Sequence, residues 1–288
     1  MAVEGLGSWT GCRGEEQRPA GYLNPQHYSL GGKDNYEVDR YVFHTLCEVA
    51  PRQAEVSRMN RRSLHRVLRY LATVAGVDQS STSAPDYLPH STPTVAQWEN
   101  PDVRVVYVDN DPVCHIHGRV LLETNRNTRF VLADLTQPES LLGLAEITDH
   151  LDFTRPVGLI MCGILHHVDD ALDPAAITRQ YIDALAPGSY LAITHFWDPA
   201  DGSAAHDLAW ELQRRFTETG LGSGWYRTRR EILDYFGDLE IIAPGLVELD
   251  DWWPAGPAFR PRLFEERLML GGLAHKPRSA RAVQMVAR

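Results

Sequence analysis

Three histidines stand at or near the ends of apolar runs of the sequence. His166 and His167 follow "PVGLIMCGIL" (156–165), and His195 lies near the end of "SYLAITHF" (189–196). An imidazole whose pKa lies near neutrality can remove a proton from a hydroxyl, an amine or an acid. All three histidines are therefore candidates for acid–base catalysis. Because neighbours at a strand end point in opposite directions, we expect one of the adjacent pair to be structural.

Two carboxylates end other apolar runs. Asp109 follows "VRVVYV" (103–108), and Asp134 ends "TRFVLAD" (128–134). A carboxylate in such a place can accept hydrogen bonds from both hydroxyls of a ribose, which we expect of Asp109, or from an adenine amino group, which we expect of Asp134. Either could instead cap the helix that follows. For the first of these helices, Asp111 is the expected cap.

Runs of strand length alternate with helical patterns through the second part of the chain. The expected strands are 103–108, 128–134, 156–165 and 189–196, and the expected helices follow Pro112 and cover about 138–150 and 173–185. This alternation predicts an α/β fold with a parallel sheet and helices on both faces. Two later runs, "LEIIAPGLVEL" and "ERLMLGGLAHKP", are expected to add an antiparallel edge. Ligands bind beyond the carboxyl ends of such strands, where Asn110, Leu135 and Gly163 would join the histidines and carboxylates.

The first part of the chain is expected to be helical. A helix pattern covers about 52–75, and Gly76 is a plausible C-cap. Before it, "HYSLGGKDNYEVDR" (27–40) could be a solvent loop or a lid that folds over a cleft. We expect a disordered tail over 1–20. The helical lid segment (21–76) and the sheet domain (77–288) would form one integrated unit.

Composition excludes several classes of function. The chain has 288 residues, of which 43% are hydrophobic, and its formal net charge is −10. This charge argues against nucleic acid as the main partner, because phosphate neutralisation needs clustered Lys and Arg. The four cysteines lack the spacing of a zinc site, so no metal is predicted. No signal peptide or apolar run of about 20 residues is found, so we expect a cytoplasmic protein without a membrane span. Its expected partner is a small-molecule substrate, and the pattern leaves the oligomeric state open.

The stretch "DQSSTSAPDYLPHSTP" (78–93) breaks this pattern. It stands where an apolar first strand and a glycine turn are expected, but it holds serines, threonines and prolines. Pro85 cannot donate a hydrogen bond within a central strand. We therefore expect a short or irregular strand at about 79–84 that breaks at Pro85.

Seven segments resemble those of a known family in content and order. They are "SLGGKDNYEVDR" (29–40), "SRMNRRSLHRVLRYLATVAGV" (57–77), "PDVRVVYVDNDPV" (101–113), "VLADLTQPESLL" (131–142), "LHHVDDALDPAAITRQYIDALAPGSYLAITH" (165–195), "YRTRREILDYFGDLEIIAPGLV" (226–247) and "GGLAHKP" (271–277). Together they resemble the actinobacterial S-adenosylmethionine-dependent methyltransferases marked by an LLGGKDN segment. The resemblance covers about residues 20–277.

The resemblance implies a class I methyltransferase (Rossmann-like) fold with a seven-stranded, mostly parallel sheet, helices on both faces and an N-terminal helical lid. Asp109 would hold the ribose of S-adenosylmethionine, and Asp134 its adenine end. The lid residues expected to cover the cofactor are Tyr28, Lys33, Asp34 and Asn35. Arg58 and Asn60 match positions that would reach the methionine carboxylate.

One departure from the family bears on the cofactor. The family's Gly-x-Gly loop lets the backbone approach the methionine portion closely, but Ser80 to Tyr87 contains no glycine. Each added side chain takes up cofactor space, which weakens the prediction of S-adenosylmethionine as cofactor, although the hydroxyls of Ser80 to Ser83 could replace some contacts.

Three functions therefore stay open. The first is a methyltransferase with an altered pocket that acts on a small molecule in secondary metabolism. The second is a cyclase, lyase or isomerase on the same scaffold, and the third is a non-catalytic partner protein.

Overall fold

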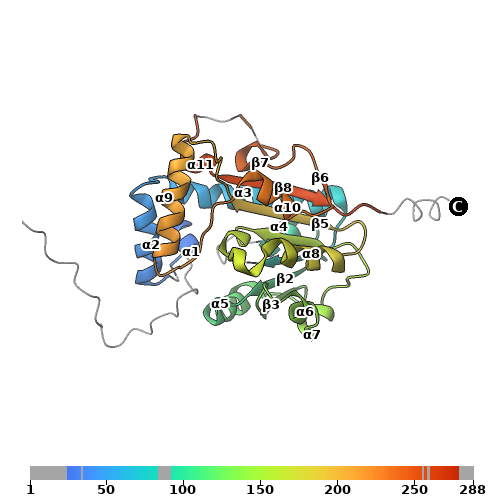
Figure 1. The fold of residues 1–288 in the computed structure, drawn as a ribbon. Coiled ribbons are helices and arrows are strands. Elements are labelled where there is room, and N and C mark those ends of the chain that lie inside the picture. Colours follow the sequence, from blue (N-terminus) through green and yellow to red (C-terminus); the bar gives the residue numbers. More distant parts are fainter. Residues whose placement is uncertain (1–24, 34, 84–91, 255, 258–259, 279–288) are drawn as a thin grey trace, which may run out of the picture.

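The central element of the fold is one twisted sheet (Figure 1). The computed structural model describes residues 25–33, 35–83, 92–254, 256–257 and 260–278. Within them the sheet has eight strands: β1 (Gln79–Ser83), β2 (Arg104–Asp109), β3 (Thr128–Leu132), β4 (Gly158–Cys162), β5 (Tyr190–Phe196), β6 (Glu240–Ile241), β7 (Val247–Glu248) and β8 (Met269–His275). Their order is β3-β2-β1-β4-β5-β8-β6, and β7 also pairs with β8.

The pairing of the strands confirms the predicted mostly parallel sheet. The strands β1 to β5 pair in parallel, and β8 runs antiparallel to β5, β6 and β7. The predicted edge run 239–249 forms two short strands because a turn at Gly245 interrupts it. The order of strands reverses beside β1, whose neighbours are β2 and β4. This reversal marks the carboxyl ends of the parallel strands as the expected ligand site.

Helices surround the sheet. They are α1 (Pro25–Ser29), α2 (Glu37–Cys47), α3 (Gln53–Tyr70), α4 (Thr92–Glu99), α5 (Pro112–Leu122), α6 (Pro138–Leu142), α7 (Ala145–Thr148), α8 (Pro174–Ala184), α9 (Ala204–Glu218), α10 (Arg229–Asp234) and α11 (Phe264–Arg267). The long helix predicted over 52–75 is α3 followed by a π-helical turn, and Gly76 ends it in the left-handed region, as predicted. The helix predicted over 138–150 is divided into α6 and α7. Among the described residues, no helix is long and apolar enough to cross a membrane.

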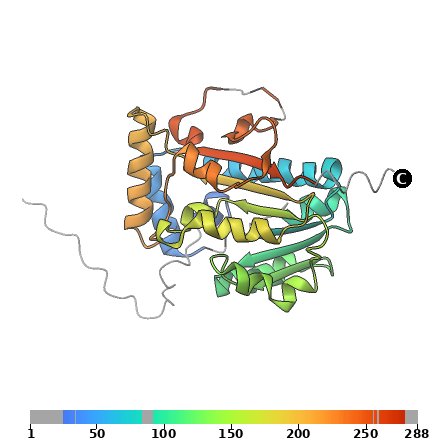
Figure 2. The same cartoon turned by 45° about the vertical axis from the view of Figure 1, so that its right-hand side comes forward.

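Two separate cores pack against the two faces of the sheet. Alternation along β2 sends Val106 and Val108 to one core, which also contains residues of α8 and α10, and Val105 and Tyr107 to the other, which contains residues of α3 and α4. Figure 2 shows helices both in front of the sheet and behind it. A third apolar cluster joins α2, α3, α9 and the start of β8. These cores fix the positions from which the strand ends and their loops project.

The polar strand β1 lies in the centre of this sheet. All five of its residues are buried and pair with β2, and Ser80, Ser81 and Thr82 also pair with β4, so the predicted short strand is confirmed and is regular. Its anchor is Gln79, whose side chain donates to the Asp152 carbonyl at 2.7 Å and accepts from the Asp152 amide at 2.9 Å. The predicted break at Pro85 lies outside the described residues. Backbone pairing and this amide clamp together hold a strand that lacks apolar side chains.

Two hydroxyls of β1 are buried without compensation. Ser80 Oγ and Thr82 Oγ1 have no hydrogen-bond partner within the described part of the chain. Both residues pair laterally with β2 residues of the core under α3, Val105 and Tyr107. An unpaired buried hydroxyl costs about 1–3 kcal/mol. These two hydroxyls therefore destabilise the folded strand rather than stabilise it.

Thr82→Val is accordingly expected to stabilise the protein by about 1 kcal/mol, since it removes the hydroxyl and keeps the β-branched shape. The unfolding temperature should rise by roughly 2–4 °C. The matched control is Thr194→Val, because the Thr194 hydroxyl donates to Asn60 Oδ1 at 2.6 Å. This control should lower the unfolding temperature, and a fall for Thr82→Val as well would contradict the account of β1.

Candidate functional site

A cavity of about 580 Å³ lies at the carboxyl ends of the parallel strands. Four of its wall residues come from four strand ends: Asp109 from β2, Asp134 after β3, Gly163 after β4 and Phe196 from β5. Helices α1 to α3, the segment 221–225 and single residues of other elements, such as Phe216 of α9 and Met269 of β8, supply much of the rest of the wall. The cavity therefore lies where the strand order predicts a ligand site.

The two carboxylates at and just after the end of β2, Asp109 and Asp111, have different roles. Asp111 caps α5, as predicted, because its Oδ1 accepts from the Val113 amide at 2.8 Å. Asp109 Oδ1 accepts from the Asp111 amide at 2.8 Å, and Asp109 also lines the cavity. Asn110 lies between them in the same wall. The Asp109 carboxylate is thus held in place at the cavity wall.

Asp134 does not cap a helix. Its Oδ1 accepts from the amide and the hydroxyl of Thr136, each at 2.8 Å, whereas α6 begins only at Pro138. The alternative role as a helix cap is therefore wrong. Asp134 and its neighbour Leu135 line the cavity beside the end of β3. Their position on the strand adjacent to β2 brings the Asp134 and Asp109 carboxylates to the same half of the cavity.

Gly163 and Asn60 lie next to each other in the cavity wall. Gly163 has φ +77°, and a Cβ added there would lie 2.8 Å from Asn60 Nδ2. Asn60 Oδ1 accepts from the Thr194 hydroxyl at 2.6 Å, which fixes the orientation of the amide. The missing side chain at Gly163 therefore leaves room for an amide donor at the cavity wall.

His166 and His167 both line the cavity, which corrects the expectation that one would point away. They lie in a 3-10 turn (Leu165–His167) rather than on a strand end, so strand alternation does not apply. The His166 ring stacks on Phe196 with centroids 3.7 Å apart. His167 Nδ1 lies 2.9 Å from Ser223 Oγ. Each ring is thus held by a different neighbour.

Burial sets the protonation of these two histidines. It lowers the pKa of His167 to about 4, an effect that a hydrogen bond with Ser223 partly offsets. Burial also lowers the pKa of His166 well below its ordinary value, and the nearby His167, His195 and Arg227 lower it further. Both imidazoles are therefore neutral at neutral pH, and each can accept a proton but offers no positive charge.

His195 does not reach the cavity. It is fully buried, its Nδ1 lies 2.6 Å from the Phe196 carbonyl, and its Nε2 lies 3.0 Å from Arg227 Nη1. Burial lowers the pKa of His195 to about 3. With both ring nitrogens engaged inside the protein, His195 has a structural position, and the expectation of a catalytic role is corrected accordingly.

Most of the predicted lid residues lie outside the cavity wall. The Tyr28 hydroxyl lies 3.3 Å from His44 Nε2, and Asn35 pairs with Arg40. Lys33 is exposed, and Asp34 lies outside the described residues. The segment 27–40 is also not a loop throughout, because α1 includes its first residues.

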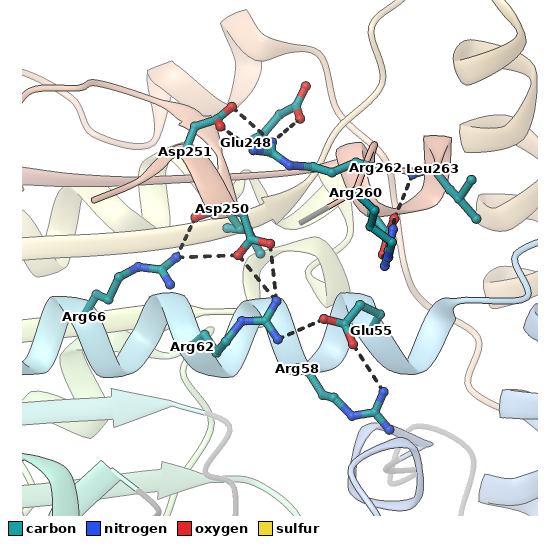
Figure 3. Close-up of polar contacts among 12 residues, drawn as sticks. Glu55, Arg58, Arg62, Arg66, Glu248, Asp250, Asp251, Arg260, Arg262 and Leu263 are labelled. Atoms are coloured by element: carbon teal, nitrogen blue, oxygen red, sulfur yellow. Dashed lines mark hydrogen bonds and ion pairs between the residues drawn. The ribbon is translucent and has the colours of Figure 1, made fainter. Parts of the chain in front are cut away.

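Arg58 also turns away from the cavity. It pairs with Glu55 at 3.4 Å, in a network of ion pairs that joins α3 to the segment 248–263 (Figure 3). Arg58 and Asn60 were both expected to reach the methionine carboxylate, but only Asn60 lines the cavity. Ser80 to Ser83 of β1 are not among the described residues that line the cavity.

Several wall residues escaped the sequence analysis. His27 and Ser29 of α1, Phe43 of α2, and Gln53 and Ser57 of α3 face the cavity. Their only signal is their place in the segment that was expected to form a lid. Gly222, Ser223 and Trp225, which follow α9 in the sequence, also form part of the wall. By contrast, Trp252 is buried in a core and packs on Trp253.

Comparison with known proteins agrees with this geometry. A sequence model of a family described as S-adenosyl methyltransferase matches residues 25–277. A candidate methyltransferase from Thermobifida fusca YX is 36% identical, with a TM-score of 0.82 over 90% of this chain and 96% of the other. A DUF574 family protein from Streptomyces avermitilis MA-4680 is 30% identical, with a TM-score of 0.80 over 88% and 96% of the two chains. No curated protein sequence matches the chain.

Proposed function

The chain belongs to the S-adenosyl methyltransferase family, and from this premise we propose that its cavity binds S-adenosylmethionine for methyl transfer to a small molecule of secondary metabolism. The proposal rests mainly on one observation. Asp109, Asp134 and Gly163 line one cavity beside the point where the strand order reverses. This arrangement favours methyl transfer over the cyclase, lyase or isomerase alternative, because carboxylates at neighbouring strand ends beside the reversal of strand order suit the ribose and adenine of a nucleoside cofactor.

The residues present fit this cofactor. Asp109 would accept from the ribose hydroxyls, and Asp134 from the adenine amino group. At Gly163, where a Cβ would meet Asn60 Nδ2 at 2.8 Å, the open backbone leaves that amide free to donate to the methionine carboxylate. S-adenosylmethionine carries a net positive charge, which suits a wall with three carboxylates.

The bound cofactor would supply an electrophilic methyl group on its sulfonium. Among the chain's own residues, His167 is the best placed to accept a proton from the acceptor. It is the less buried of the two cavity histidines, and Ser223 orients its ring at 2.9 Å. A pKa of about 4 makes His167 a weak base. A weak base suffices here, because a hydroxyl becomes strongly acidic as its oxygen bonds to carbon.

His167→Asn is therefore expected to lower methyl transfer by about 10²- to 10⁴-fold, the usual contribution of a general base. The measurement uses S-adenosylmethionine labelled in its methyl group, together with a small-molecule extract of Streptomyces avermitilis, the source of a 30% identical relative. With the wild-type chain, label should move into an extractable small molecule.

The control for this variant is His115→Asn, which changes a histidine of α5 that does not line the cavity. It should transfer label like the wild type. Label that stays entirely in the cofactor with the wild-type chain would contradict the proposed function, and unchanged transfer by His167→Asn would contradict the role of His167.

A further inference from the structure

We infer that the methyl acceptor is a small, flat aromatic molecule that carries a hydroxyl or amino nucleophile and no carboxylate or phosphate group. The inference rests on the proposed function, since it takes S-adenosylmethionine to occupy the acidic half of the cavity. Three features of the cavity carry it: the order of the strand ends, the rings of the other half and the balance of charge.

The strand order separates the cavity into two chemically different halves. Along the sheet edge, the wall residues follow the order Asp134, Asp109, Gly163 and Phe196, from β3 through β2 and β4 to β5. Neighbouring strands lie about 4.8 Å apart, so the four steps from β3 to β5 span roughly 19 Å. The carboxylates and the Phe196 ring therefore stand at opposite ends of the cavity, which leaves the second end for the acceptor.

Flat rings line this second end. The wall residues Phe196 and His166 stack at a centroid distance of 3.7 Å, and Tyr226, which does not line the cavity, stacks on Phe196 at 4.8 Å. Phe216 packs on the same ring at 5.1 Å. Trp225 is held to this group because its backbone amide donates to the His166 carbonyl at 2.8 Å. Fixed aromatic walls of this kind favour a flat, apolar ligand.

The charges of the cavity select against an anionic acceptor. Asp109, Asp111 and Asp134 line it, and no lysine or arginine does so among the described residues. The two cavity histidines are neutral, because burial lowers the pKa of each. A carboxylate or phosphate would lose its hydration there without gaining a cationic side chain of the protein as a partner, whereas an uncharged ring would lose little.

The test compares two probes that share one ring system, 2-naphthol and 2-naphthoate. Each is titrated by calorimetry into the full chain saturated with S-adenosylhomocysteine, which fills the cofactor half. We expect 2-naphthol to bind at least about 10-fold more tightly, a difference of about 1.4 kcal/mol. If 2-naphthoate binds equally well or better, or if 2-naphthol fails to bind at about 1 mM, the inference is overturned.

Two tryptophan variants locate the binding. Trp225→Ala should weaken 2-naphthol binding at least about 10-fold, since it removes a ring from the wall. Trp210→Ala should leave it unchanged, because Trp210 lies on α9 with 60% of its surface exposed and does not line the cavity. Equal effects of the two variants would overturn the inference. Failure of S-adenosylhomocysteine itself to bind would instead contradict the proposed function, so the two failures are distinguishable.

Discussion

Asp109→Ala is expected to weaken the binding of S-adenosylhomocysteine at least about 100-fold. Asp109 ends β2 in the cavity wall, and each hydrogen bond between its carboxylate and a ribose hydroxyl contributes about 1.5–3 kcal/mol. Losing two such bonds exceeds the 2.7 kcal/mol that a 100-fold change requires. Calorimetric titration of the purified variant gives the affinity directly. Asp109→Asn keeps one oxygen acceptor and should bind with intermediate affinity.

Two controls accompany this variant. Asp102→Ala removes an exposed carboxylate just before β2 and should leave the affinity unchanged. Thermal unfolding of Asp109→Ala shows whether the fold survives, because Asp109 also accepts from the Asp111 amide at 2.8 Å. A folded Asp109→Ala variant with wild-type affinity would show that the ribose lies elsewhere.

Arg227→Met is expected to destabilise the protein by about 3–5 kcal/mol, the usual cost of removing one partner from a buried charged network. Arg227 is 4% exposed. It donates to the Leu165 carbonyl at 3.1 Å and to the Val168 carbonyl at 2.6 Å, and its Nη1 lies 3.0 Å from His195 Nε2. These contacts flank His166 and His167, so their loss leaves buried carbonyls unpaired and releases the turn that carries both histidines.

The ion pair of Arg227 with Asp170 contributes less to this loss, because 75% of the Asp170 side chain is exposed and water screens the pair. Arg227→Lys keeps the charge but loses the planar fork, so its stability should lie between those of Met and wild type. The control is Arg230→Met, which changes an exposed arginine of α10. Thermal or urea unfolding measures all three variants, and wild-type stability of Arg227→Met would contradict the role of this network.

The sheet was predictable because its local signals agree. Apolar runs such as 103–108 and 156–165 have strand length, and helical patterns separate them, so element type and order follow from periodicity. The strand ends then fix which residues meet, and Asp109, Asp134 and Gly163 indeed line one cavity. β1 was harder to predict, since its position depends on pairing with β2 and β4 rather than on its own composition.

The remaining part of the site depends on tertiary packing. Phe43, Phe216 and Trp225 come from elements far apart in the sequence, and no local pattern states that their rings meet in one wall. His195 illustrates the same limit at a strand end. A histidine near the end of a buried strand has the same sequence signal whether it faces a cavity or, as here, Arg227 inside the protein.

The most direct measurement is a calorimetric titration of the wild-type chain with S-adenosylmethionine and S-adenosylhomocysteine. The account predicts saturable binding to one site with a Kd in the micromolar range, about −8 kcal/mol, despite the missing glycines between Ser80 and Tyr87. The absence of binding for both ligands at about 1 mM would contradict the central claim that this cavity is a methyl-donor site.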